Sequence, residues 1–177
     1  AVQVFEANPP EGVQAVDWTL LTSEPIYSLD DAARVVDHYR ARWLIEEFFK
    51  ALKTGCAVEQ RQLTTRGGLE KAVAVFMPMA WEMLRLRHLS RVEPETPALT
   101  IVSAEDLVIV RALLGETKRD FVLPQQPTVR DLLLGIARLG GHLKRNGHPG
   151  WITLGRGMDQ LVRARSIWAL AKKCDQS

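Results

Sequence analysis

The pattern of apolar and polar residues predicts a β-hairpin over residues 1–22. The run AVQVF is short and β-prone, NPPEG is typical of a turn, and VDWTLLT resumes the extended pattern. In this second run Val16, Trp18 and Leu20 recur with a period of two, which places them on one face of a strand. Because the chain opens on Ala1 directly in a strand-like run, we expect the natural protein to begin further upstream.

A helical period follows from about Leu29 to Lys53, and Gly55 is expected to end this helix. Ser28 with Asp31 three residues later is a variant of the capping box, which satisfies free backbone amides at a helix start. The apolar face of the helix is expected to anchor in a core and comprises Ala33, Ala41, Leu44, Ile45, Phe48, Phe49, Ala51 and Leu52.

A second long helix is predicted from about Leu69 to Arg91, and Pro78 inside it is expected to produce a kink. Its buried stripe is expected to comprise Val73, Phe76, Met77, Ala80 and Leu84.

Three further helices are predicted in the second half of the chain. Two of them, over residues 103–115 and 128–141, open with a hydroxyl residue followed three positions later by aspartate and close on glycine. The last spans about Gly157–Lys173, with an apolar stripe that is either intramolecular core or a dimer seam: Leu161, Ala164, Trp168 and Ala171. The pattern therefore predicts a mostly α chain with a small β portion.

Composition limits the class of protein. The chain is 46% hydrophobic and 25% charged, which is ordinary for a globular protein. No apolar run approaches the roughly 18 residues of a membrane span, so we expect no membrane partner. Cys56 and Cys174 lie outside any metal-ligand spacing, and a reduced protein of the cytoplasm is the simplest interpretation.

The net charge of +2 conceals a strong segregation of charge along the chain. Residues 1–33 sum to −6, residues 34–91 to +5, residues 92–116 to −4 and residues 117–177 to +7. Two basic blocks favour a polyanionic partner. Solvated helix faces explain the same charges equally well.

One stripe on the helix predicted over residues 29–53 carries candidate chemistry. At about 100° and about 1.5 Å per residue, four residues fall within an arc of roughly 60° and a length of about 21 Å. They are Tyr39, Arg42, Glu46 and Lys53. The centre of this arc lies roughly 135° from the centre of the apolar face. One carboxylate between two cations, with a phenol nearby, suits metal-assisted chemistry on a phosphate backbone.

These four residues form the pattern Tyr-x2-Arg-x3-Glu-x6-Lys, which resembles the signature of bacterial insertion-sequence transposases of the DDE type. The similarity extends to NPPEGVQAVDWTLLTSEPI before the stripe, YRARWLIEEFFKALKTG in it, and IARLGG at 136–141. Together these runs look like the transposases of kanamycin-resistance composite transposons, and the likeness is strongest from Asn8 to Arg91.

The resemblance implies an RNase H-like α/β catalytic core, of which residues 1–91 would be the last part. Residues 92–177 would form a helical dimerisation domain. Glu46 matches the third catalytic carboxylate of such enzymes, a ligand of Mg²⁺ (or Mn²⁺). The other two acids are upstream aspartates that this sequence does not contain, so we expect the chain alone to bind no metal and to be inactive.

The resemblance also implies DNA-binding roles. Arg42, Lys53 and Tyr39 would contact phosphates, and Trp18 would stack on a base flipped out during hairpin formation. The reactions implied are hydrolysis at the 3′ end, hairpin formation and opening, and strand transfer, by a homodimer on double-stranded transposon ends in the bacterial cytoplasm. No small-molecule substrate is expected.

Each assignment has a plainer alternative. Glu46 can be an exposed acid that pairs with Lys50, and Trp18 can be ordinary core on a half-buried strand. Loop cations that either contact DNA or remain solvated are Arg61, Arg66, Lys118, Arg119, Lys144 and Arg145. Two other functions remain open: a non-catalytic helical fragment that dimerises or inhibits through mixed dimers, and an RNase H-like nuclease or resolvase.

Overall fold

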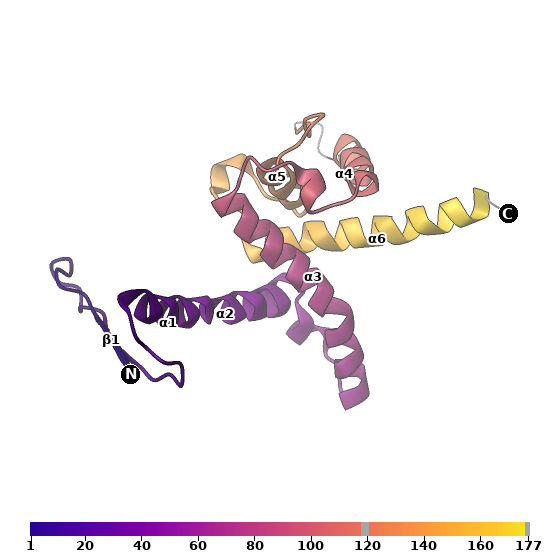
Figure 1. Cartoon of the computed structure of the whole chain (residues 1–177). Helices are drawn as coiled ribbons and strands as arrows, with labels where there is room; N and C mark the ends of the chain where they lie inside the picture. The colour runs from indigo at the N-terminus through magenta and orange to yellow at the C-terminus, as the bar shows by residue number, and fades with distance from the viewer. Residues whose placement is uncertain (118–120, 176–177) are drawn as a thin grey trace. The chain divides into compact units, whose positions relative to one another are not determined.

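A computed structural model describes residues 1–117 and 121–175, and these residues are mostly helical with a two-stranded sheet (Figure 1). The expectation of a mostly α chain with a small β portion is confirmed. In the described residues, no helix combines the length and the apolar character needed to cross a membrane.

The elements in chain order are strands β1 (Val2–Phe5) and β2 (Asp17–Leu20), helices α1 (Leu29–Ala41) and α2 (Trp43–Lys50), the π-helical η1 (Ala51–Gly55), the 3₁₀ segment η2 (Val58–Arg61), α3 (Arg66–Val92), the 3₁₀ segment η3 (Ala98–Thr100), α4 (Ala104–Thr117), α5 (Val129–Leu139), the 3₁₀ segment η4 (Lys144–Asn146) and α6 (Trp151–Asp175).

Contacts divide the chain into two compact units, residues 1–47 and 48–177, and the division falls inside α2. The expected division into a catalytic part at 1–91 and a dimerisation domain at 92–177 concerns function and stays a prediction.

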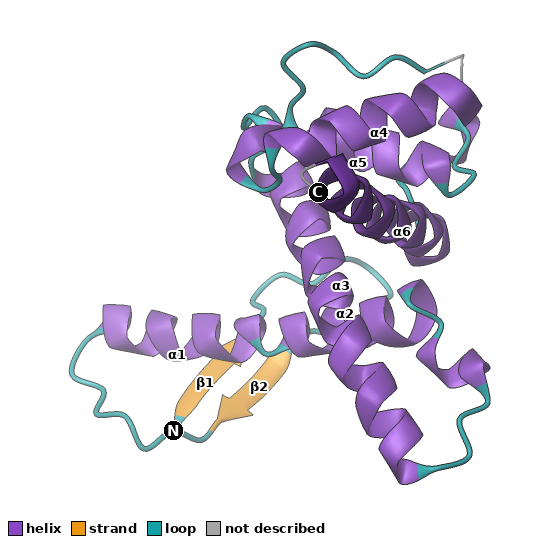
Figure 2. Ribbon diagram, turned by 90° about the vertical axis from the view of Figure 1, so that its right-hand side faces the viewer, coloured by secondary structure: helices purple, strands orange, loops and turns teal. Residues whose placement is uncertain are grey.

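The first unit is the hairpin with α1 beside it (Figure 2). β1 and β2 pair in antiparallel register, with Val4 opposite Trp18, which confirms the predicted hairpin. The buried core of this unit is small, and consists of Val2, Leu20 and Val35. Half-buried apolar side chains from both elements, Trp18 among them, pack around these three residues.

The start of α1 is the predicted capping box. The Ser28 hydroxyl accepts a hydrogen bond from the Asp31 amide, and the Asp31 carboxylate accepts one from the Ser28 amide. Hydrogen bonds from the Tyr27 amide, the Ser28 hydroxyl and Arg34 lower the pKa of Asp31 below its ordinary value. The box fixes where the chain turns from the loop into the helix.

The second unit is built from α3, α4, α5 and α6 around one continuous core (Figure 1). Its largest fully buried side chains come from all four helices: Met83, Leu114, Leu132, Ile136, Leu154 and Leu161. Arg165 of α6 joins two of the other helices, because it donates to Asp106 of α4 at 2.6 Å and to Glu82 of α3 at 3.1 Å. Burial opposes the ionisation of Asp106, but the hydrogen bonds from Arg165 and Ser103 outweigh it and lower the pKa of this carboxyl.

Glycines allow three backbone segments of this unit to touch. A side-chain carbon on Gly155 of α6 would overlap the carbonyl oxygen of Gly55, at the end of η1. One on Gly157 would overlap the carbonyl oxygen of Ile136 in α5. Only residues without a Cβ can hold α6 this close to its neighbours. These glycines also explain why the predicted start of α6, at Gly157, was wrong: the helix begins at Trp151 and contains them.

The helix predicted over residues 29–53 is not continuous, and this expectation was wrong. The Arg42 amide bonds to the Tyr39 carbonyl and the Ile45 amide to the Arg42 carbonyl, so the ladder tightens there to i, i+3 spacing. The last five residues, Ala51–Gly55, widen into a π-helix. Gly55 does end the helical segment, as predicted.

Other boundaries and burial patterns also differ in part from the predictions. α3 begins at Arg66, three residues early, because Thr65 caps it by accepting from the Gly68 amide. α5 begins and ends as predicted, whereas α4 continues past Gly115 to Thr117. In α3, Ala80 is buried as predicted but Met77 is exposed.

The stripe predicted on α6 divides into two parts. Leu161 is buried and Ala164 packs against the core, so these two residues are intramolecular core. Trp168 and Ala171 are exposed, as are the other residues over 166–174. Both cysteines are free; Cys56 is buried, which raises the pKa of its thiol to about 11.

The glycine contacts generate a prediction on stability. Gly157→Ala forces α6 away from α5 and should lower the free energy of unfolding by at least about 2 kcal/mol. The matched control is Gly115→Ala in α4, where a Cβ meets nothing within 4 Å, and which should raise stability by about 0.5–1 kcal/mol. Urea denaturation followed by circular dichroism measures both. Equal effects of the two substitutions would contradict the close approach at Gly157.

Candidate functional site

Four of the five predicted site residues form a continuous series of contacts within the first unit. Trp18 on β2 packs edge-on against Tyr39 of α1, with ring centroids 5.2 Å apart and an interplanar angle of 63°. The Arg42 guanidinium lies 5.6 Å from the centroid of the Tyr39 ring. Arg42 Nη1 in turn donates to Glu46 Oε1 at 3.0 Å. The strand and the helix thus bring together residues 28 positions apart in sequence.

The aromatic pair joins this series to the core of the unit. Trp18 is half-buried and packs against the small cluster of Val2, Leu20 and Val35. Edge-to-face aromatic contacts are worth about 0.5–1.5 kcal/mol beyond simple burial. Tyr39 is therefore held in position from the strand side, and its ring supports the Arg42 guanidinium on the other.

The charged end of the series is open to solvent. The side chains of Arg42 and Glu46 are 54% and 36% exposed. An exposed pair of this kind, four residues apart on a helix, contributes only about 0.3–0.5 kcal/mol. A ligand that binds either group therefore displaces the other at little cost.

Lys53, the fifth predicted residue, belongs to the second unit. It lies in η1, and its Nζ is 3.0 Å from Glu59 Oε1. The predicted stripe assumed a turn of about 100° per residue from Tyr39 to Lys53. This value does not apply to Lys53, because a π-helix turns the chain by a different angle per residue.

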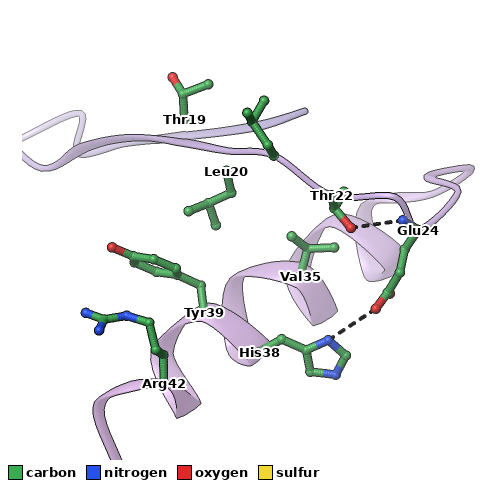
Figure 3. Close-up of a pocket in the computed structure, with 9 residues that line it drawn as sticks. Thr19, Leu20, Thr22, Glu24, Val35, His38, Tyr39 and Arg42 are labelled. Carbon is green, nitrogen blue, oxygen red and sulfur yellow. Dashed lines mark hydrogen bonds and ion pairs between the residues drawn. The ribbon is translucent and has the colours of Figure 1, made fainter. Parts of the chain in front are cut away.

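A groove opens beside the aromatic pair (Figure 3). Its volume is about 470 Å³, and its lining comes from the strand end, the following loop and α1: Thr19, Leu20, Leu21, Thr22, Glu24, Val35, His38, Tyr39 and Arg42. Glu24 Oε1 lies 3.5 Å from His38 Nδ1, and the Glu24 amide donates to the Thr22 hydroxyl at 3.0 Å. The sequence reasoning missed His38 and Glu24, although His38 is one helical turn before Arg42, a spacing that indicates a shared face.

The described residues do not provide a metal site by themselves. Among them, no three His, Cys, Asp or Glu side chains come together as metal ligands. Glu46 is a hard oxygen donor of the kind that Mg²⁺ prefers, but it is one donor where a site needs several. Glu46 is therefore the right type of ligand for Mg²⁺, but the described residues do not supply enough such ligands at one place.

Two of the loop cations, Arg61 and Arg66, have structural partners. The Arg61 guanidinium lies 4.1 Å from the centroid of the Phe76 ring and donates to the Cys56 carbonyl. Arg66 pairs with Glu70 at 2.7 Å. Arg145 is exposed. Lys118 and Arg119, as well as the Lys144 side chain, lie outside the described residues.

One comparison with known proteins matches part of the chain. Residues 8–76 match the model of a protein family described as Transposase DDE domain. The matched segment contains β2, α1, α2 and η1 and therefore all five predicted site residues. The match covers less than half of the chain and supports a transposase function in general.

The exposure of the Arg42–Glu46 pair leads to a prediction on stability. Arg42→Gln and Glu46→Gln should each change the free energy of unfolding by less than about 0.5 kcal/mol. The control is Arg165→Gln, which removes the partner of the partly buried Asp106 and should cost about 1–3 kcal/mol. Urea denaturation of the three variants measures the difference. A loss above about 1 kcal/mol at Arg42 would show that this pair is structural.

Proposed function

We propose that the chain is the C-terminal portion of a cut-and-paste DNA transposase, which performs metal-dependent strand cleavage, hairpin formation and strand transfer at transposon ends. The observation that carries the proposal is the series from Trp18 through Tyr39 and Arg42 to Glu46, which lies within the segment that matches the transposase DDE domain. Such an enzyme acts on chromosomal DNA in the bacterial cytoplasm.

In this proposal, Glu46 is the third of three carboxylates and the one that this chain supplies. Mg²⁺ or Mn²⁺ held by all three would stabilise the charge on the attacking and leaving oxygens at phosphorus. Two aspartates outside this sequence would complete the site. The half-exposed carboxylate of Glu46 and its easily exchanged partner Arg42 support this role.

The weak pairing of Arg42 with Glu46 also supports a proposed role for Arg42. In the free chain the guanidinium neutralises Glu46. When Glu46 ligates a cation, Arg42 is free to bind a phosphate oxygen through two parallel hydrogen bonds. Tyr39 holds the guanidinium from behind and offers its hydroxyl as a further donor. Lys53 would contact a more distant phosphate after it leaves Glu59.

Trp18 is proposed to stack on a base that leaves the helix during hairpin formation. Unpairing a base costs a few kcal/mol, and stacking on an aromatic side chain returns about 1–3 kcal/mol per base. Edge-on packing of Tyr39 keeps the Trp18 ring in one orientation, which lowers the entropy lost when a base stacks on it.

Homodimerisation is proposed for residues 92–177. The last three turns of α6 carry apolar side chains that the second unit leaves uncovered. Ile167 is 68% exposed, Leu170 63% and Trp168 39%. Exposed apolar side chains that follow one another along a helix are typical of an interaction surface.

A second candidate is a non-catalytic fragment that dimerises with a complete transposase and inhibits it. This candidate is favoured by the lack of a three-acid cluster in the described part of the chain. A third candidate is an RNase H-like nuclease, which does not require Trp18 packed on Tyr39 or the exposed end of α6.

A binding experiment tests the role of Arg42. A fluorescein-labelled duplex of about 20 base pairs, closed by a hairpin at one end, is titrated with the 177-residue chain and followed by anisotropy. Arg42→Gln should weaken binding about tenfold and reduce the salt dependence of log K by about one phosphate contact. The matched control is Arg40→Gln, which loses the same charge from an exposed pair with Asp37 and should bind like the unmodified chain. Equal losses of DNA affinity in both variants would show that Arg42 contributes only a non-specific positive charge.

A cleavage experiment tests the need for further carboxylates. With Mg²⁺ and supercoiled plasmid DNA, the chain alone should produce no nicked product, because one carboxylate does not make a two-metal site. Glu46→Gln, prepared in parallel, is the control for contaminating nucleases. A nick that the unmodified chain makes and Glu46→Gln does not would show that this chain holds a complete active site.

A further inference from the structure

The second unit contains a pocket that the proposed transposase function does not use. Its volume is about 750 Å³, within the range of small-molecule sites. It is enclosed by the end of α3, one face of α5 and the loop before α6. The residues that line it are Ser90, Arg91, Phe121, Arg130, Leu133, Leu134, Arg138, His142, Gly147, His148 and Pro149.

The interior of this pocket is apolar, with a few polar groups in fixed positions. Leu133 is buried, and Phe121 and Leu134 are half-buried beside it. Ser90 and His142 are the buried polar residues of the described chain, and both line the pocket. The Ser90 hydroxyl donates to the Arg87 carbonyl at 2.8 Å, which offsets the cost of its burial. An apolar interior with a few polar groups is typical of sites for small organic ligands.

The charged groups of the pocket all have one sign. None of the described residues that line it is Asp or Glu, whereas Arg91, Arg130 and Arg138 are cations. Arg138 is held in place, because it donates to the His142 carbonyl at 3.1 Å. Arg91 and Arg130 are exposed at the rim, and no hydrogen bond or ion pair within the described part of the chain uses their guanidinium groups.

His148 reports the positive potential of the pocket. Burial lowers its pKa first, and the nearby charges of Arg91 and Arg87 lower it further. Burial is the larger cause, and the smaller contribution of the arginine charges agrees with a place where an anion is favoured.

We propose that this pocket binds a small amphipathic anion. Its acidic group, a carboxylate, phosphate or sulfonate, pairs with Arg91 and Arg130, and its apolar body packs against Phe121, Leu133 and Leu134. A DNA backbone has the negative charge that the arginines would bind, but it has no apolar part to pack against these three side chains. Most of the residues that line the site lie in the region proposed to dimerise, and all lie outside the segment that matches the transposase domain, so the ligand would be an effector and not a substrate.

The test uses anilinonaphthalene sulfonate, a fluorescent amphipathic anion, with the folded 177-residue chain. Binding should saturate at one site. The neutral analogue N-phenylnaphthylamine, which lacks the sulfonate, should bind at least about tenfold more weakly, because charge-assisted hydrogen bonds are lost. Inorganic phosphate, which lacks the apolar body, should not compete at millimolar concentration.

Two variants locate the binding. Arg130→Gln should weaken the affinity for anilinonaphthalene sulfonate about tenfold. The matched control is Arg156→Gln, an exposed residue of α6 that does not line the pocket, which should leave the affinity unchanged. Circular dichroism checks that both variants are folded.

Three results would overturn the proposal. Equal affinity in the two variants would show that the dye binds elsewhere. Equal affinity for the dye and its neutral analogue would show that the arginines play no part. Displacement of the dye by a short DNA duplex would assign the pocket to a DNA interface. None of these results depends on DNA cleavage. The anion site can therefore be disproved while the transposase function holds, and the transposase function can be disproved while the anion site holds.

Discussion

The second unit depends on the contact of α6 with two other backbone segments, at Gly155 and Gly157. Because no side chain intervenes, the first half of α6 lies deep enough for Leu154, Met158 and Leu161 to be buried. The contact with Gly55 also fixes the end of η1, where the chain leaves the helical segment that follows Glu46. Two glycines in a helix reduce its intrinsic stability by about 1 kcal/mol each, and the burial that they permit outweighs this loss.

The candidate site has a different physical basis, because its charges neutralise each other. Arg42 and Glu46 form a pair that is stable enough to hold both side chains and weak enough to exchange. The rigid part of the site is aromatic: Trp18 and Tyr39 connect the pair to the core of the first unit. Such a division, with a fixed support and exchangeable charges, suits the proposed site, which would bind both a cation and a phosphate.

Local signals in the sequence were sufficient for the hairpin and for the helix starts at Ser28, Ser103 and Thr128, because each is set by neighbours within a few residues. Features that depend on distant contacts were missed. Gly155 and Gly157 resemble a loop until their partners in η1 and α5 are known.

The site shows the same limit. The positions of Tyr39, Arg42 and Glu46, each about one helical turn from the next, follow from their spacing. The contact of Tyr39 with Trp18 requires the pairing of the hairpin with α1, and the different position of Lys53 follows from the π-helix over Ala51–Gly55. The tight turn at Arg42 and the π-helical turn that begins at Ala51 have no sequence signal, because no Gly or Pro lies between residues 29 and 54.

The small core of the first unit has a consequence for its motion. Three buried residues hold the hairpin against α1, and a core of this size supplies little free energy against local opening. The strands and α1 should therefore exchange their amide protons through openings that leave the larger core around Met83 and Ile136 intact. In such a segment, a bound polynucleotide would add contacts that the small core lacks, and would thereby order the residues that bind it.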